Sequence, residues 1–357
     1  MDSPFRYTGD EFVVWIPGAG KETVLALSEQ ILASCRQAIP LVDNQFEVGA
    51  SIGIALYPQH GADIDSLLKH ADIAIYQAKR LRLSVQMYQA DKQDITELQV
   101  RLRGQLNSAL TREEFTLLYQ PKVSLPDGKV FAAEALVRWQ HPTEGLLAPA
   151  LFIELIEQCG IIHGFTRFVI EEALKQISCW LERGISLCVS VNLSPYNLAD
   201  DKLVTFIQTK LQLHNVPAEL LELELTESAT MVDIKTTIAT FARLRALGVK
   251  LSIDDFGTGM SSFSYIKQLD VDYVKIDRSF IANVLEDRRD KLIVQGLITM
   301  CHSLNKTVIA EGVETAQQAA CLHELGCLYA QGYYFGRPMK ADELFKKINI
   351  INDRAYQ

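Results

Sequence analysis

Strand-length apolar segments alternate with helical segments from about Phe115 to Pro338. Eight segments have the length and composition of strands, namely Thr116–Val123, Val130–Trp139, Leu187–Ser194, Leu220–Thr226, Lys250–Asp255, Tyr273–Asp277, Thr307–Glu311 and Leu328–Tyr334. Helical segments lie between them, for example Phe165–Arg183, Ile234–Leu247 and Arg288–Leu304. This alternation predicts an α/β fold with a closed (β/α)8 barrel of TIM type, and an open doubly wound sheet is the alternative.

A short turn joins the first two of these strands. It reads Pro126-Asp127-Gly128-Lys129 and leaves no room for a helical crossover. Such a turn makes a hairpin, because parallel neighbours need a longer connection. We therefore predict a modified barrel in which one strand runs antiparallel to the rest.

Two further regions precede the barrel, which we assign to residues 112–350. Residues 91–111 are rich in charge, and leucines at helical spacing predict one connecting helix, either a signalling coiled coil or a helix packed on one domain. These leucines are Leu98, Leu102, Leu106 and Leu110. Residues 1–90 form a separate α+β region. Its expected elements are strand Glu11–Ile16, helix Lys21–Ala38, strand Phe46–Leu56, helix Leu67–Arg80 and strand Val85–Tyr88.

Side chains alternate between the two faces of a strand, and in the barrel strands one face is aliphatic and the other polar. In Lys250–Asp255, for example, Leu251 and Ile253 oppose Ser252 and Asp254. The aliphatic face should pack on the helices, so the polar face should point into the barrel. Polar side chains then converge near the C-terminal strand ends, where β/α barrels hold their active sites. They are Glu134, Asn192, Glu224, Asp254, Lys275 and Glu311.

Converging carboxylates predict a metal site. Buried like charges repel one another and lose hydration, and divalent cations remove both costs. Oxygen ligands without Cys or His suit Mg²⁺ or Mn²⁺ better than Zn²⁺. The adjacent Asp254 and Asp255 could bridge two ions, an arrangement common in displacement at phosphorus. Lys275 would orient water or a phosphoryl oxygen.

The alternative is that each inward carboxylate is the ion-pair partner of a buried cation. The obvious cations are Lys275 and Arg138. Two cations are too few to pair separately with the inward polar groups of four strands. Glu222, one layer deeper than Glu224, has no evident partner. The metal hypothesis is therefore favoured.

Composition limits the class of protein. A net charge of −9 argues against a general nucleic-acid binder. The longest apolar runs, such as Leu187–Val191, are too short to span a bilayer. The seven cysteines form no Cys-x-x-Cys pair, and the residues after Met1 do not resemble a signal peptide. We expect a cytoplasmic protein with no membrane segment.

Several segments of the barrel region resemble the EAL-domain family of cyclic di-GMP phosphodiesterases. The name motif stands as Glu134-Ala135-Leu136, and other similar segments are YQPKV from Tyr119, VNLSP from Val191, ELTES from Glu224, DDFGTG from Asp254, VKID from Val274, AEGVE from Ala310 and QGYYFGRP from Gln331. The resemblance implies a metal-dependent enzyme that opens cyclic di-GMP, its substrate, to linear pGpG. Met260 is the visible departure, because an aromatic residue more often follows the DDFGTG segment.

The resemblance also implies residue roles. The metal ligands would be Glu134, Asn192, Glu224, Asp254, Asp255 and Glu311. Glu311 is described as ligand or general base, Lys275 lies near the attacking water, and Glu227 steadies the DDFGTG loop. Residues lining the dinucleotide site would be Gln120, Leu136, Arg138, Asp277, Glu314 and Gln331, with Arg138 on a phosphate. Members that only bind cyclic di-GMP usually lose several of these positions, so a silent receptor is the alternative. Members often work as dimers, which leaves a homodimer open.

Residues 1–90 resemble the C-terminal half of a GGDEF diguanylate cyclase domain. The signature stands as Tyr7-Thr8-Gly9-Asp10-Glu11-Phe12, and ASIGIA from Ala50 and ADIAIYQAK from Ala71 also match. Thr8 replaces a glycine that lets the backbone approach a nucleotide. In that family the metal-binding aspartate and nucleotide-binding helices precede the signature. The resemblance therefore implies a partial, degenerate region without cyclase activity, in which Asp10 and Glu11 have no catalytic role.

Overall fold

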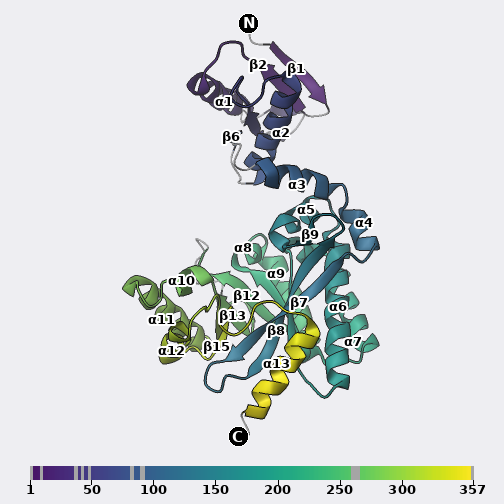
Figure 1. Cartoon of the computed structure of the whole chain (residues 1–357), viewed down its shortest axis with the longest axis vertical. Coiled ribbons are helices and arrows are strands. Elements are labelled where there is room, and N and C mark those ends of the chain that lie inside the picture. The colour runs from purple at the N-terminus through teal and green to yellow at the C-terminus, as the bar shows by residue number, and fades with distance from the viewer. Residues whose placement is uncertain are drawn as a thin grey trace. The chain divides into compact units, whose positions relative to one another are not determined.

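The structure is a computed structural model that describes residues 3–8, 11–35, 39–41, 44–46, 50–80, 84–88, 93–258 and 266–354. It divides into two compact units, Met1–Gly104 and Gln105–Gln357 (Figure 1). Asp10, the Glu11 side chain and Met260 lie outside the described part, so the expectations made for them stay predictions.

The first unit contains short strand pairs and helices. Two strand pairs are antiparallel, β1 (Ser3–Thr8) with β2 (Glu11–Trp15) and β3 (Ile39–Leu41) with β4 (Asn44–Phe46). A third pair, β5 (Ile52–Ile54) with β6 (Val85–Met87), is parallel. The helices are α1 (Lys21–Cys35) and α2 (Ile64–Arg80). Helix α2 approaches β5 so closely that a Cβ on Gly53 would lie 2.1 Å from the Ala71 carbonyl oxygen. The predicted single strand Phe46–Leu56 is wrong, because β4 ends at Phe46 and β5 begins at Ile52.

The predicted continuous helix over residues 91–111 is also wrong. Two helices occupy this stretch, α3 (Gln93–Arg103) and α4 (Leu106–Thr111). Gly104 lies at the break, and glycine disfavours a helix interior by roughly 1 kcal/mol relative to alanine. Leu102 and Leu106, on either side of the break, are both 1% exposed, whereas Leu98 and Leu110 are half-buried.

The second unit is a closed barrel, which confirms the predicted fold class. The barrel strands are β7 (Phe115–Ser124), β8 (Val130–His141), β10 (Cys188–Asn192), β11 (Leu221–Thr226), β12 (Lys250–Phe256), β13 (Tyr273–Ile276), β14 (Thr307–Ala310) and β15 (Tyr329–Gln331). Pairing of β8 with β10 closes the ring and excludes the open sheet. Strand β7 is antiparallel to both neighbours, β8 and β15, and the other barrel pairings are parallel. A short strand, β9 (Gly145–Leu147), extends the sheet beside β8.

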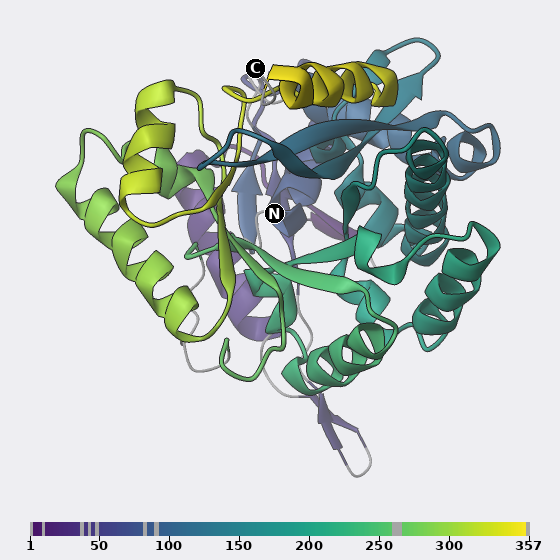
Figure 2. The ribbon, with the colours of Figure 1, turned by 90° about the horizontal axis from the view of Figure 1, so that it is seen from below.

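Helices surround the strands (Figure 2). They are α5 (Ile153–Gln158), α6 (Ile162–Glu182), α7 (Leu203–Leu213), α8 (Glu227–Thr230), α9 (Ile234–Ala246), α10 (Arg278–Ala282), α11 (Arg288–Ser303), α12 (Ala316–Glu324) and α13 (Ala341–Arg354). In α6 the buried residues Phe165, Val169, Ala173 and Ile177 recur at helical spacing, so one apolar stripe faces inward. Within the described ranges, none of the helices combines the length and apolar character that crossing a membrane requires.

Two predicted strands are shorter in the structure by more than one residue. Strand β10 ends at Asn192, because Ser194 caps the 3-10 helix η3 (Pro195–Ala199) and Pro195 cannot donate to a strand ladder. Strand β15 ends at Gln331, where Gly332 passes so close to Val313 that a Cβ would lie 2.1 Å from its carbonyl oxygen. Both endings therefore place the functional candidates Asn192 and Gln331 at the barrel rim.

Candidate active site

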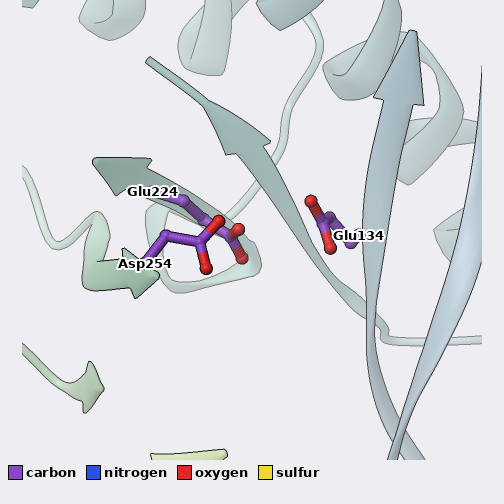
Figure 3. A group of neighbouring side chains, drawn as sticks. All are labelled: Glu134, Glu224 and Asp254. Atoms are coloured by element: carbon purple, nitrogen blue, oxygen red, sulfur yellow. The ribbon is translucent and has the colours of Figure 1, made fainter. Parts of the chain in front are cut away.

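Acidic side chains from separate barrel strands meet at one end of the barrel. Glu134 on β8, Glu224 on β11 and Asp254 on β12 offer oxygen atoms within 4.8 Å of one another. Figure 3 shows Glu224 and Asp254 side by side, with Glu134 across from them. Asp254 also groups at this spacing with Asp255 and with Glu311, which follows β14.

Strand register explains why these side chains meet. Glu224 lies opposite Asn192, and Glu134 lies opposite Gln120 of the antiparallel strand β7. Because faces alternate every second residue, Glu222 shares the inward face with Glu224, one layer deeper. On β11 the inward face thus contributes Glu224 to the rim and Glu222 to the layer beneath it.

Lys275 on β13 lies at the centre of the cluster and is 1% exposed. Its Nζ is 2.6 Å from Glu224 Oε2, 2.8 Å from Glu311 Oε1, 3.1 Å from Asp254 Oδ2 and 3.5 Å from Glu134 Oε2. Burial acts to lower the pKa of Lys275, but these carboxylates, Asp254 foremost, raise that pKa well above its ordinary value. Lys275 is therefore a fixed positive charge.

The carboxyl groups differ in their ionisation. Burial raises the pKa of Glu134 and raises that of Glu311 well above its ordinary value, and Lys275 only partly offsets this effect. Burial would also raise the pKa of Glu224, but Lys122 and Lys275 together bring it below its ordinary value. Burial and the neighbouring Asp254 raise the pKa of Asp255. The rim therefore resists full ionisation unless further positive charge is present.

Lys122 on β7 is a site residue that the sequence hypothesis missed. Its Nζ lies 2.9 Å from Glu222 Oε1 and 2.6 Å from Glu224 Oε1, and all three side chains are fully buried. Glu222, for which no partner was evident, therefore has one. The expectation that Lys275 and Arg138 are the available buried cations was incomplete. Strand parity could have found Lys122, because it shares a face with Gln120.

Side-chain amides hold Glu134 at both oxygens. Asn192 Nδ2 donates to Oε1 over 2.8 Å, and Gln331 Nε2 donates to Oε2 over 2.7 Å. Gln331 Nε2 also donates to Gln120 Oε1 over 3.1 Å, and Gln120 Nε2 donates to the Gly336 carbonyl oxygen over 3.1 Å. The structure therefore brings Asn192, Gln120 and Gln331 into one network with Glu134.

The segment after β12 adopts an unusual backbone. Asp255 has a φ of 54°, in the left-handed region, and its N–H donates to Asp254 Oδ1 over 2.9 Å. Aspartate tolerates this conformation better than most residues. Gly257 donates its N–H to Oε2 of Glu227 over 2.8 Å, and Glu227 is 2% exposed at the start of α8. Glu227 thus anchors the backbone that presents Asp254 and Asp255.

Four other candidates have different surroundings. Arg138 is half-buried on β8 and donates to its neighbour's carbonyl oxygen, Val137 O, over 2.8 Å. Asp277 caps α10 by accepting from Ser279 N–H over 2.9 Å. Glu314 is exposed, and Leu136 is half-buried. Across the described ranges, no hydrogen bond or ion pair joins these four to the carboxylate cluster.

The donor set fits hard divalent cations. The grouped ligand atoms are carboxylate oxygens, which Mg²⁺ and Mn²⁺ prefer. Six carboxylates (Glu134, Glu222, Glu224, Asp254, Asp255 and Glu311) accompany two buried lysines, Lys122 and Lys275. Full ionisation leaves four negative charges in excess, an amount that two divalent cations would neutralise.

Comparison with known proteins places the chain in a family. Residues 103–338 match the EAL domain, and residues 1–83 match the diguanylate cyclase GGDEF domain. The chain is 37% identical over 350 residues to the bifunctional diguanylate cyclase/cyclic di-GMP phosphodiesterase MucR of Pseudomonas aeruginosa, covering 98% of this chain and 51% of MucR. It is 40% identical over 336 residues to the cyclic di-GMP phosphodiesterase NbdA of the same organism, covering 94% of this chain and 43% of NbdA. The chain thus spans about half the length of these relatives.

A solved structure agrees with this assignment. The c-di-GMP complex of the PaMucR phosphodiesterase matches with a TM-score of 0.66 at 41% identity, covering 68% of this chain and 99% of that one. The sequence match, the barrel topology and the acidic residues of the rim all indicate the same family. The chain belongs to the EAL-domain family, and its N-terminal unit is a GGDEF region.

Proposed function

We propose that the barrel hydrolyses cyclic di-GMP to linear pGpG with Mg²⁺ or Mn²⁺. The observation that supports this most is the convergence of the complete acidic set, grouped around Asp254 within 4.8 Å. Relatives named as cyclic di-GMP phosphodiesterases share 37–40% of their aligned residues with the chain.

The proposed ligands are Glu134, Asn192, Glu224, Asp254, Asp255 and Glu311. Two bound divalent cations would stabilise negative charge at phosphorus and lower the pKa of water. The product pGpG has a free 5′-phosphate, so water adds to one phosphorus atom and the bond from that phosphorus to O3′ breaks. The departing O3′ then gains a proton.

The chain's own residues divide the remaining work. Glu311 accepts the proton of the attacking water, a role that its place beside Lys275 Nζ, at 2.8 Å, and in the group with Asp254 and Asp255 supports. Lys275 stays protonated and orients the water or a phosphoryl oxygen. Glu227 holds the backbone at Gly257 and so keeps the Asp254–Asp255 pair in position.

Substrate contacts are proposed for a second group of residues. They are Gln120, Leu136, Arg138, Asp277, Glu314 and Gln331. The guanidinium of Arg138 suits a phosphate, to which it can donate two parallel hydrogen bonds. Glu134 already accepts from Gln331, so substrate and metal contacts would share one network.

The test is product analysis with the purified chain. Cyclic di-GMP is incubated with Mg²⁺, Mn²⁺ or EDTA, and the nucleotides are separated by chromatography. We expect pGpG with either metal and none in EDTA, and no pGpG from the Glu134→Ala variant. Tight binding of cyclic di-GMP without pGpG would refute the proposal and favour the silent receptor.

The sequence and its resemblance lead to three further questions that experiments can test. The first unit should not make cyclic di-GMP from GTP, since Thr8 occupies the position of a signature glycine. The resemblance leaves a homodimer open, which light scattering tests. The chain should reside in the cytoplasm, which fractionation of producing cells tests.

A further inference from the structure

Lys122 lies in the layer beneath the rim. It follows Gln120 by two residues on β7, where Gln120 pairs with Glu134 and Lys122 pairs with Ala132. Strand β8 runs toward the rim, so Ala132 and Lys122 lie deeper than Glu134. From there Lys122 reaches across the barrel interior to β11, where its Nζ contacts Glu222 and Glu224.

The two oxygens of Glu224 are thereby divided between two layers. Oε1 accepts from Lys122 over 2.6 Å, and Oε2 accepts from Lys275 over 2.6 Å. Lys275 is also the contact of Asp254 and Glu311, so Oε2 is the oxygen on the rim side. A carboxylate held at one oxygen from below presents its other oxygen in one orientation.

We propose that Lys122 is a positioning residue of the metal site, acting through Glu224. It keeps Oε1 in the lower layer so that Oε2 faces the rim. This inference rests on the proposed function insofar as it assumes that Glu224 binds a divalent cation. Groups that orient metal ligands commonly change metal affinity or activity 10- to 100-fold when they are removed.

A simpler role for Lys122 is to neutralise Glu222. The fully buried Glu222 lies 2.9 Å from the ammonium group, and an unpaired carboxylate there would be strongly unfavourable. The two roles make different predictions once Glu222 has lost its charge. An uncharged residue 222 no longer needs Lys122 to neutralise it. Glu224, however, still needs Lys122 to hold its Oε1.

The paired variant Lys122→Met/Glu222→Gln separates the two roles. Lys122→Met alone would leave the Glu222 carboxylate unpaired and can fail to fold, so it is not the decisive variant. Glu222→Gln is the matched control, because an amide oxygen can still accept from Lys122 while the contact to Glu224 is kept. Circular dichroism and the thermal midpoint check that both variants are folded.

The measurement is Mn²⁺ binding by isothermal titration calorimetry, on the full chain without substrate. We expect Glu222→Gln to bind Mn²⁺ almost as tightly as the unaltered chain, and the paired variant to bind it about 10- to 100-fold more weakly. Excess Mn²⁺ should restore much of the lost kcat while leaving the KM for cyclic di-GMP almost unchanged.

A folded paired variant with unaltered Mn²⁺ affinity would overturn the inference and leave Lys122 the neutralising role. Failure of the unaltered chain to produce pGpG while it binds Mn²⁺ would refute the proposed function alone, because the titration does not involve substrate. If the paired variant does not fold, Lys122→Met/Glu222→Leu is measured in the same way, since it fills the space with apolar groups.

Discussion

Replacing Lys275 by methionine tests whether the rim holds unbalanced negative charge. The substitution removes an ammonium group that lies within 3.5 Å of four carboxylates. Removing one partner of a buried ion pair typically costs about 3–5 kcal/mol. In a domain of this size each kcal/mol moves the thermal midpoint by roughly 2–4 °C, so the midpoint should fall by roughly 6–20 °C in EDTA.

Thermal unfolding followed by circular dichroism measures this effect. The pH should be above neutral, because protonation of Glu134 and Glu311, whose pKa values burial raises, would relieve the same repulsion. Mn²⁺ supplies positive charge that the variant lacks, so it should raise the midpoint more in the variant than in the unaltered chain. An ion present at 100 times its Kd adds about 2.7 kcal/mol per site to the free energy of unfolding.

Lys175→Met is the matched control. Lys175 also lies 2.6 Å from a carboxylate, that of Glu172, but its side chain is 52% exposed. Exposed pairs contribute roughly 0–1 kcal/mol, so its midpoint should hardly change. An unchanged midpoint for Lys275→Met in EDTA, or an equal Mn²⁺ increment in both proteins, would show that the rim carries no unbalanced negative charge.

The other predictions concern the rim and the segments that hold it. Glu311→Gln should lower kcat by about 100-fold or more, since a general base contributes about that much. Its circular dichroism spectrum should not change, and a normal kcat would show that Glu311 is not the general base. Glu227→Gln weakens the acceptor for the Gly257 N–H. It should lower kcat by about 10-fold, the smallest effect usual for removing a group that orients a metal ligand. An unchanged kcat in steady-state kinetics would contradict this role of Glu227. Gly312→Ala should lower the thermal midpoint, because Gly312 has a φ of 71° and an added Cβ would lie 2.4 Å from Arg278 Cβ; a variant as stable as the unaltered chain would show that the backbone relaxes at no cost. Mn²⁺ affinity should fall as the pH falls, because the pKa values of Glu134 and Glu311 are raised and protons on these carboxylates compete with the ion. Equal affinities in calorimetry from mildly acidic to mildly alkaline pH would contradict this.

Much of the fold follows from local patterns. The turn around Gly128 is short enough to require a hairpin, and this sets the antiparallel direction of β7. The two-residue period of strands predicted that Glu134, Glu224 and Asp254 share the interior, where their oxygens lie within 4.8 Å of one another. Such features depend on neighbours in the sequence, so they can be read from it.

Other features depend on contacts between distant segments. Lys122 lies 100 positions before Glu222, and its role depends on the barrel closing so that β7 faces β11. The end of β15 depends on a tertiary contact too, the close approach of Gly332 to Val313, so local sequence does not predict it. The break at Gly104 was a local signal, but the leucine period on both sides concealed it.

The stoichiometry of bound Mn²⁺, measured together with turnover, shows whether the barrel rim is a two-metal catalytic site. The chain is stripped with a chelator, titrated with Mn²⁺ in a calorimeter, and assayed for pGpG at each metal concentration. We expect two ions per barrel and a rate that rises as the sites fill. Full turnover in the stripped chain, or turnover without measurable Mn²⁺ binding, would contradict it.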